Sequence, residues 1–192
     1  MQLKAGDEIS YRVAFLEMSK APNLSWPEFT NSNLFLILSK DPSIRYFLDL
    51  YNAVGSDYEW TDMHDLPVTE IEDFLNSTDV KLYTLLKSGY SAGFFILDNR
   101  LKYSCDLSYF GLVPGVIGTG LGKLLLRMAV KLAWALPKID KLTVNTCSLD
   151  HPNALSLYKK IGFEISKVEQ STRVLKYSRN IDYNNWLDKV RN

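Results

Sequence analysis

The spacing of apolar and polar positions divides the chain into helical and extended segments. Apolar residues recur at intervals of three and four over 44–54 and 121–136, and this 3.6-residue period predicts amphipathic helices. Similar but shorter patterns predict helices over 67–76, 151–161 and 181–190. Asp41 and Pro42 suit the N-cap and first position of the helix over 44–54.

Segments rich in β-branched and aromatic residues predict strands between these helices. The expected strands are 8–16, 34–38 (short and buried), 80–87, 90–97, 101–113 and 141–147, with 163–168 and 174–177 as a closing pair. Ser88-Gly89 predicts a tight hairpin, and Asp98-Asn99 a second turn, which gives a three-stranded antiparallel meander. The order predicts one α/β domain over residues 1–192, a mixed and mostly antiparallel sheet with helices on both faces.

A glycine-rich turn joins the strand 101–113 to the helix 121–136. Gly118, Gly120 and Gly122 stand at alternate positions before the apolar helical pattern. The first backbone N–H groups of a helix have no intrahelical acceptor and lie at the positive end of its dipole, and glycines let an anion approach them closely. The turn therefore predicts a phosphate or pyrophosphate site.

Two familiar phosphate motifs are excluded by counting. In a G-x-G-x-x-G fingerprint the third glycine would fall at Lys123 or Leu125. A Walker A loop would need glycine at Ile117 and Ser or Thr at Leu124.

The run IGTGLG at 117–122 resembles the acetyl-CoA loop, Arg/Gln-x-x-Gly-x-Gly/Ala, of the GNAT (Gcn5-related) N-acetyltransferases, with Ile117 departing from the first position. Downstream, ALSLYKKIGF at 154–163 resembles the A-x-x-L-Y-x-x-x-G-F segment of the same family. The resemblance covers residues 80–177. YFGLVP at 109–114 and TCSLDHP at 146–152 are similar to motifs of a bacterial subgroup.

The resemblance implies a GNAT fold, whose strands 101–113 and 141–147 splay to form a cleft for acetyl-CoA. It implies direct acetyl transfer to a primary amine in a ternary complex, and an oxyanion donor among the backbone N–H groups near Leu112 and Val113. The implied acetyl-CoA contacts are Leu112, Val113, Ile117, Gly118, Thr119, Gly120, Leu121, Gly122, Lys123, His151 and Asn153.

The resemblance also points to Tyr158 as the acid for the leaving thiolate. A neutral tyrosine, with a pKa of about 10, can protonate a thiolate whose thiol has a pKa nearer 8.5. The alternative is an aromatic packed on an amphipathic helix. Asp106 is a candidate base, since it is the acidic residue between Leu101 and Pro114, although a strand aspartate can simply face solvent. His151 is a second candidate base, and it equally suits the turn before the helix.

The segment 56–66, SDYEWTDMHDL, interleaves acidic and aromatic residues. Carboxylates attract an ammonium group, and aromatic faces add cation–π attraction. We expect Asp57, Tyr58, Trp60 and Asp62 to bind a small cationic amine acceptor. A solvated acidic loop is the open alternative.

Composition narrows the class of protein further. The 192 residues carry 22 basic and 22 acidic side chains, so no global field favours nucleic acid or a membrane surface. The N-terminus lacks a signal-peptide pattern, which favours a cytoplasmic protein. We expect the protein to be a monomer or a homodimer. Cys105 and Cys147 are expected to be buried thiols, and histidines and cysteines show no metal-ligand spacing. A CoA-binding sensor without catalysis is the second hypothesis, favoured by Ile117 and His151 and opposed by Tyr158.

Overall fold

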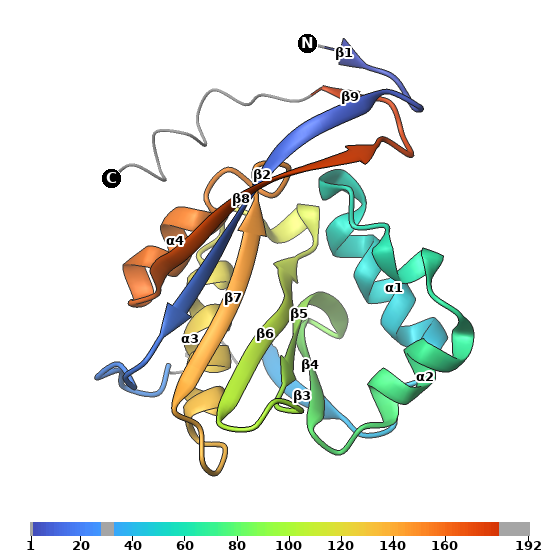
Figure 1. Ribbon diagram of the computed structural model, residues 1–192. Helices are drawn as coiled ribbons and strands as arrows, with labels where there is room; N and C mark the ends of the chain where they lie inside the picture. Colours follow the sequence, from blue (N-terminus) through green and yellow to red (C-terminus); the bar gives the residue numbers. More distant parts are fainter. Residues whose placement is uncertain (1, 28–32, 181–192) are drawn as a thin grey trace.

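The computed structural model describes residues 2–27 and 33–180 (Figure 1). Its main sheet has the strand order β3-β4-β5-β6-β7-β2-β8, and β1 pairs separately with β9. The strands are β1 (Gln2–Leu3), β2 (Glu8–Met18), β3 (Leu34–Ser39), β4 (Val80–Lys87), β5 (Tyr90–Asp98), β6 (Ser104–Leu112), β7 (Lys141–Cys147), β8 (Glu164–Val174) and β9 (Arg179–Asn180). The α-helices are α1 (Ile44–Gly55), α2 (Val68–Asn76), α3 (Leu121–Trp134) and α4 (Ala154–Ile161). The helix expected over 181–190 lies outside the described residues.

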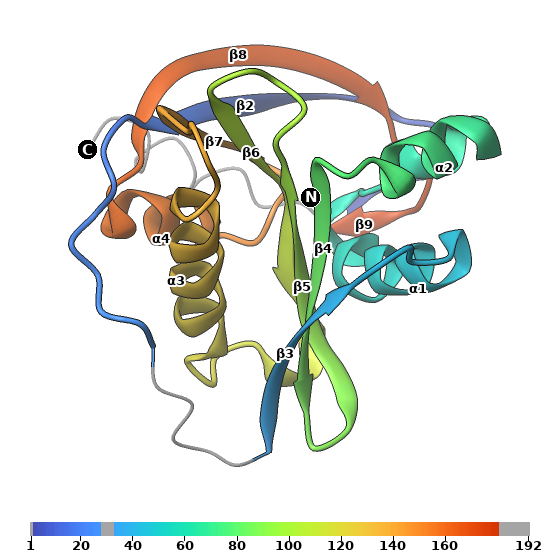
Figure 2. The ribbon, with the colours of Figure 1, turned by 90° about the horizontal axis from the view of Figure 1, so that it is seen from below.

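Helices cover both faces of the sheet, as expected for an α/β fold. Figure 2 shows α3 and α4 on one face and α1 and α2 on the other. Phe95 and Leu125 belong to the core under α3, whereas Phe47 and Phe94 belong to the core under α1. Neighbouring residues of β5 therefore pack into opposite cores, because side chains alternate along a strand.

The N-terminal strand β2 lies inside the sheet. It pairs antiparallel with β7 from Val13–Cys147 to Met18–Leu142, and with β8 along its other edge. The expected closing pair of 163–168 with 174–177 is wrong, because β8 is a single strand through Val174 and β2 is its partner. The pairing of β2 with β8 joins residues that are far apart in the sequence, so no local pattern predicts it.

The sheet opens between β6 and β7. These two strands are parallel, and their pairing covers only Ser104–Asp106 with Lys141–Thr143. Beyond this short ladder the strands separate, and α3 starts near the opening (Figure 1). The expected splay is therefore present.

Three local predictions differ from the structure. Asp41 has a φ of 50°, and Ser43 is the N-cap of α1, with its hydroxyl accepting the Tyr46 N–H at 3.3 Å. The strand β3 forms as expected but at the sheet edge, where Phe35 and Ile37 are 56% and 45% exposed instead of buried.

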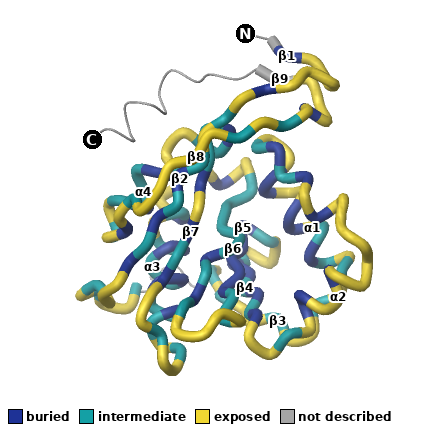
Figure 3. Tube along the Cα trace, in the orientation of Figure 1, coloured by how far each residue is buried: buried dark blue, intermediate teal, exposed yellow. Residues whose placement is uncertain are grey.

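The third difference is the buried face of α3. The sequence predicts that this face is formed by Leu121, Leu124, Leu125, Met128, Leu132, Ala135 and Leu136, but the helix is rotated from that orientation. Its buried residues are Leu121, Leu125, Leu126, Ala129, Val130 and Ala133, whereas Leu124, Met128 and Leu132 are only partly covered (Figure 3). The small side chains of Ala129 and Ala133 suit this face because they let the helix lie close to the sheet. No helix in the described ranges is long and apolar enough to cross a membrane.

Candidate active site

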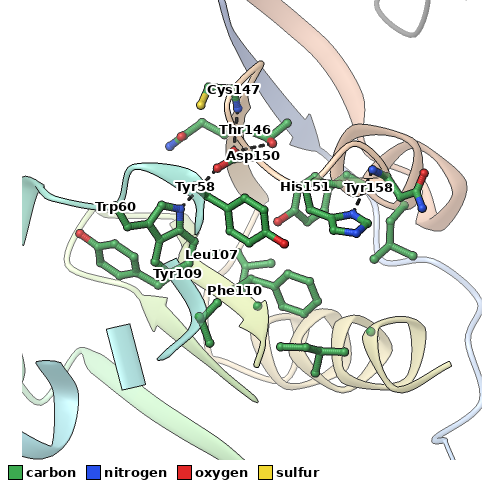
Figure 4. Close-up of a pocket in the computed structure, with 18 of the residues that line it drawn as sticks. Tyr58, Trp60, Leu107, Tyr109, Phe110, Thr146, Cys147, Asp150, His151 and Tyr158 are labelled. Carbon is green, nitrogen blue, oxygen red and sulfur yellow. Dashed lines mark hydrogen bonds between the residues drawn. The ribbon is translucent and has the colours of Figure 1, made fainter. Parts of the chain in front are cut away.

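A pocket of about 490 Å³ occupies the opening between β6 and β7. Its walls come from the loop after α1, the ends of β6 and β7, the turn before α3 and the start of α4, with side chains added from β2 and β8. In the close-up, Trp60 and Tyr109 lie at one end, His151 and Tyr158 at the other, and Tyr58 between them (Figure 4). Segments that are far apart in the sequence therefore share one cavity.

The turn before α3 forms one wall of the pocket. Gly118 and Gly120 have φ of 84° and 85°, and a Cβ on either would meet nothing within 4 Å. The backbone conformation, and not lack of space, therefore requires glycine there. Gly120 is the N-cap of α3, and the hydroxyl of Thr119 donates to the carbonyl of Val116 at 2.7 Å, which braces the turn.

This wall has the properties of an anion site. Gly118, Gly120 and Gly122 line the pocket together with Lys123 and Ile117, so the start of α3 faces it. The open space around the Cα atoms of Gly118 and Gly120, the first-turn N–H groups and the lysine fit a phosphate-bearing ligand. Thr119 and Leu121 belong to the same turn, but their side chains are not part of the lining.

The two residues expected to supply an oxyanion donor differ in their backbone bonding. The Val113 N–H donates to the carbonyl of Ala92 at 3.0 Å and is therefore directed at β5. Because N–H groups alternate between the two edges of a strand, the Leu112 N–H is directed at the opposite edge, where β7 has separated from β6. Leu112 lines the pocket, and Val113 does not.

Tyr158 lies on α4 and lines the pocket, although it is only 5% exposed. Its ring contacts Phe110 and Phe163 edge-on, at centroid distances of 6.0 and 5.9 Å. Burial raises the pKa of Tyr158 far above its ordinary value, and the charges of Asp150 and Asp106 add to the increase. The phenol is therefore protonated at neutral pH.

Asp106 is not part of the pocket lining. Its carboxylate accepts the hydroxyl of Thr143 at 2.6 Å and that of Ser108 at 2.9 Å, next to the short β6–β7 ladder. Burial raises its pKa, and these two hydrogen bonds oppose the increase. These contacts favour a role in joining β6 to β7, and Asp106 as base stays an untested prediction.

A different carboxylate, Asp150, lines the pocket. Its Oδ2 accepts the hydroxyl of Thr146 at 2.7 Å and the backbone N–H of Cys147 at 2.8 Å. The indole N–H of Trp60 donates to its Oδ1 at 3.4 Å (Figure 4). Protein atoms surround Asp150 and raise its pKa by desolvation, yet part of the residue stays accessible.

The expected acceptor residues are only partly in the pocket. Tyr58, Trp60 and Asp62 line it, whereas Asp57 is exposed and does not. Glu59 lines the pocket instead of Asp57, at 2% exposure.

The loop after α1 is held to β8 by ion pairs. Arg173 of β8 donates through Nη2 to the Thr61 hydroxyl at 2.8 Å and to the Asp62 carboxylate at 3.2 Å. Lys176 pairs with Asp65 just beyond this contact. The acidic charge of Asp62 and Asp65 is therefore matched by cations of the chain itself.

His151 and Asn153 both line the pocket at the start of α4. The ring of His151 packs edge-on against Tyr58, with centroids 6.2 Å apart, and its Nδ1 accepts the Asn153 N–H at 3.1 Å. Asn153 is the N-cap residue of α4. The histidine thus stabilises the turn before α4, which is one of the three roles that the sequence suggests for it.

Cysteine chemistry finds no support in this site. Cys105 is buried, Cys147 is partly buried at the pocket wall, and both are free thiols. Burial raises the pKa of Cys147 to about 12, so little thiolate exists at neutral pH. Within the described ranges, His, Cys, Asp and Glu do not gather into a group that could hold a metal ion.

Sequence reasoning missed several pocket residues. Asp150 stands in the TCSLDHP motif, which was the available signal, but Asp150-His151-Pro152 also suits a turn before the helix. Glu59 stood within the acidic loop. Arg173 gave no signal, because its contact with Thr61 joins residues 112 positions apart.

The splayed sheet and the glycine turn at the start of α3 define an α/β fold of the acetyltransferase class. The chain belongs to the acetyltransferase (GNAT) family, whose model matches residues 47–163. No curated protein matches the sequence.

Solved structures share this fold at low sequence identity. A GCN5-related N-acetyltransferase from Kribbella flavida is 16% identical with a TM-score of 0.57, over 84% of this chain and 56% of its own. A GNAT acetyltransferase from Elizabethkingia anophelis with acetyl-CoA bound is 21% identical with a TM-score of 0.52, over 71% and 80%. An aminoglycoside acetyltransferase from a soil metagenome is 13% identical with a TM-score of 0.56, over 69% and 89%. This chain thus spans little more than half of the Kribbella protein.

Proposed function

We propose that this protein transfers the acetyl group of acetyl-CoA directly to a primary amine of a small cationic molecule, within a ternary complex. The observation that carries the proposal is the single pocket that joins the glycine turn of α3 to Tyr158 and to the aromatic loop after α1. A phosphate-binding end and an amine-binding end at one cavity are what such a transfer needs. The Elizabethkingia neighbour holds acetyl-CoA, and the metagenomic neighbour is named for an aminoglycoside.

Each part of the reaction has a candidate in the chain. The turn 117–123 would hold the pyrophosphate through backbone N–H groups, with Lys123 adding positive charge. The Leu112 N–H, at the open edge of β6, would donate to the oxyanion formed when the amine attacks the thioester carbon. As the carbon–sulfur bond breaks, Tyr158 would give its proton to the thiolate, and the nitrogen's surplus proton would restore the phenol.

The amine end combines aromatic faces with acidic charge. Trp60 and Tyr109 lie with ring centroids 5.6 Å apart, and Tyr58 lies between them and His151 (Figure 4). Asp150 and Glu59 contribute negative charge to this end, whereas Asp62 is matched by Arg173. An ammonium group would find both cation–π attraction and a carboxylate there.

The test is isothermal titration with acetyl-CoA, followed by thiol release over a panel of primary amines. We expect saturable binding, amine-dependent release of CoA, and a loss of at least about a hundredfold in kcat for Tyr158→Phe with the acetyl-CoA Kd unchanged. Tyr83→Phe is the matched control, because Tyr83 stacks on Phe95 outside the pocket and should leave kcat unchanged. Binding without release from any amine would support a CoA sensor instead, and absence of binding would contradict the glycine-turn assignment.

A further inference from the structure

The transfer proposed above requires a group that removes a proton from the acceptor's ammonium, because only a neutral amine attacks a thioester. Among the residues that the structure describes, three carboxylates line the pocket: Glu59, Asp62 and Asp150. The three carboxylates differ in exposure and in hydrogen bonding, and these differences decide which of them can act as the base.

Two of the three are poorly suited to take the proton. Asp62 lies at the pocket rim, with its side chain 79% exposed and its Oδ1 bonded to Arg173. That oxygen of Asp62 therefore already has an internal partner. Glu59 is 2% exposed, so little of it can touch a substrate.

Asp150 has the placement that the other two lack. In the close-up it lies between Trp60 of the amine end and Tyr158, the proposed acid (Figure 4). The charge of Asp150 also raises the pKa of Tyr158 more than any other charge does, which agrees with the two side chains lying close together. An amine held between these residues would have a proton acceptor on one side and the acid for the thiolate on the other.

The hydrogen bonds of Asp150 leave one oxygen available. Thr146 and Cys147 fix Oδ2 at 2.7 and 2.8 Å. In the described chain, Oδ1 receives the Trp60 indole at 3.4 Å, longer than an ordinary N–H···O hydrogen bond. The carboxylate is thus held in one orientation by Oδ2, while Oδ1 keeps capacity to accept a proton.

We propose that Asp150 is the general base of the acetyl transfer. Its Oδ1 accepts one proton from the acceptor's ammonium, the neutral amine then attacks the acetyl carbon, and the proton later passes from Asp150 to solvent. This inference rests on the proposed function and adds to it the residue that activates the amine. It replaces Asp106, which is not among the pocket-lining residues and whose carboxylate accepts the hydroxyls of Thr143 and Ser108.

The surroundings of Asp150 set the pH range in which it can act as a base. The titratable groups that line the same pocket are Tyr11 from β2, Tyr51 from α1, Tyr58, Glu59 and Asp62 from the loop after α1, Tyr109 from β6, Lys123 from α3, Cys147 from β7, His151 and Tyr158 near α4, and Arg173 from β8. Desolvation is the largest effect on Asp150 and raises its pKa. A raised pKa makes a carboxylate a stronger base, and it moves the acidic limb of kcat/KM above the ordinary aspartate range.

The experiment compares the pH profiles of kcat/KM for the wild type, Asp150→Asn, Trp60→Phe and Asp106→Asn with one amine, so that the ionisation of the amine is common to all. Infrared titration of the protein without ligands follows the carboxylic C=O band, and calorimetry follows the acetyl-CoA Kd. We expect Asp150→Asn to lose about a hundredfold or more in kcat/KM, to lose the acidic limb and one titrating band, and to bind acetyl-CoA as before.

Trp60→Phe separates catalysis from positioning. It removes the indole donor to Oδ1 but keeps the carboxylate and an aromatic ring, so we expect it to keep the acidic limb and to lose less than tenfold. If Trp60→Phe loses as much as Asp150→Asn, or if the limb survives in Asp150→Asn or disappears in Asp106→Asn, the base assignment is overturned while the acetyl transfer stands. A wild type that releases CoA with no amine overturns the proposed function and the base together.

Discussion

Gly120 is a residue at which a single backbone angle controls both stability and the proposed phosphate site. Its φ is 85°, it is the N-cap of α3, and a Cβ there would meet nothing within 4 Å. The constraint is therefore conformational, since side-chain residues rarely adopt this region of backbone space.

Gly120→Ala should lower the free energy of unfolding by about 1–2 kcal/mol and weaken acetyl-CoA binding. The alanine would force the turn away from positive φ and rotate the N–H groups at the start of α3. Gly115→Ala is the matched control, because Gly115 also has open space around its Cα but is not among the residues with positive φ. Denaturant unfolding and calorimetry measure the two effects, and equal losses in both variants would contradict this account.

At the scale of elements, the loop after α1 is ordered by a strand that is distant in sequence. Arg173 of β8 contacts Thr61 and Asp62, and its side chain is 19% exposed. In the neighbouring pair, the Lys176 side chain is 40% exposed, and neither Lys176 nor Asp65 lines the pocket. Of the two pairs, only the one made by Arg173 therefore belongs to the pocket lining.

Arg173→Met should raise the KM for the amine about tenfold while the acetyl-CoA Kd stays unchanged. The variant keeps the apolar stem and removes the donors that hold the loop, so Tyr58 and Trp60 lose their fixed positions. Lys176→Met is the comparison and should change the KM less than threefold. Steady-state kinetics with varied amine make the measurement, and a larger effect of Lys176→Met would show that the loop is held otherwise.

The sequence predicted those elements whose signals are local. The period of 3.6 located α1, α2, α3 and α4, and segments rich in β-branched and aromatic residues located β2 to β7, whereas the two-residue strands β1 and β9 were not predicted. The sequence prediction failed where a strand pairs with a segment that is distant in the sequence. The strand β8 is continuous because β2 pairs along one of its edges, and residues 163–177 alone do not carry that information. Ser43 replaced Asp41 as the cap of α1 because several nearby residues have suitable side chains, and their propensities alone cannot choose among them.

The candidate site was predictable to the same extent. The glycine turn is a contiguous motif, so Gly118, Gly120 and Gly122 were found, and all three line the pocket. The YFGLVP segment has a structural reason in Gly111, where a Cβ would lie 2.2 Å from the Cγ1 of Val54 on α1. Arg173 and the contact of Trp60 with Asp150 depend on the fold, and no local pattern marks them.

At the scale of the whole molecule, β2 joins the N-terminal part of the chain to both sides of the site. It lies between β7, which forms one wall of the pocket, and β8, which carries Arg173. Tyr11 and Val13 of β2 line the pocket, and Leu16 is buried in the core under α3. Loss of β2 packing should therefore affect the fold and the site together.

Leu16→Ala tests this coupling. Leu16 is 1% exposed, so its truncation should lower the free energy of unfolding by about 2–5 kcal/mol. Val168→Ala on the adjacent β8 is the control, and because Val168 is 38% exposed it should cost less than about 1 kcal/mol. Tryptophan fluorescence, far-ultraviolet circular dichroism and acetyl-CoA binding should all be lost in one coincident transition, since β2 pairs on both edges and belongs to both the sheet and the site. If Leu16→Ala still binds acetyl-CoA after part of the fluorescence or circular dichroism signal has been lost, the account is contradicted. The pocket would then not require β2, and β7 would keep its position without β2.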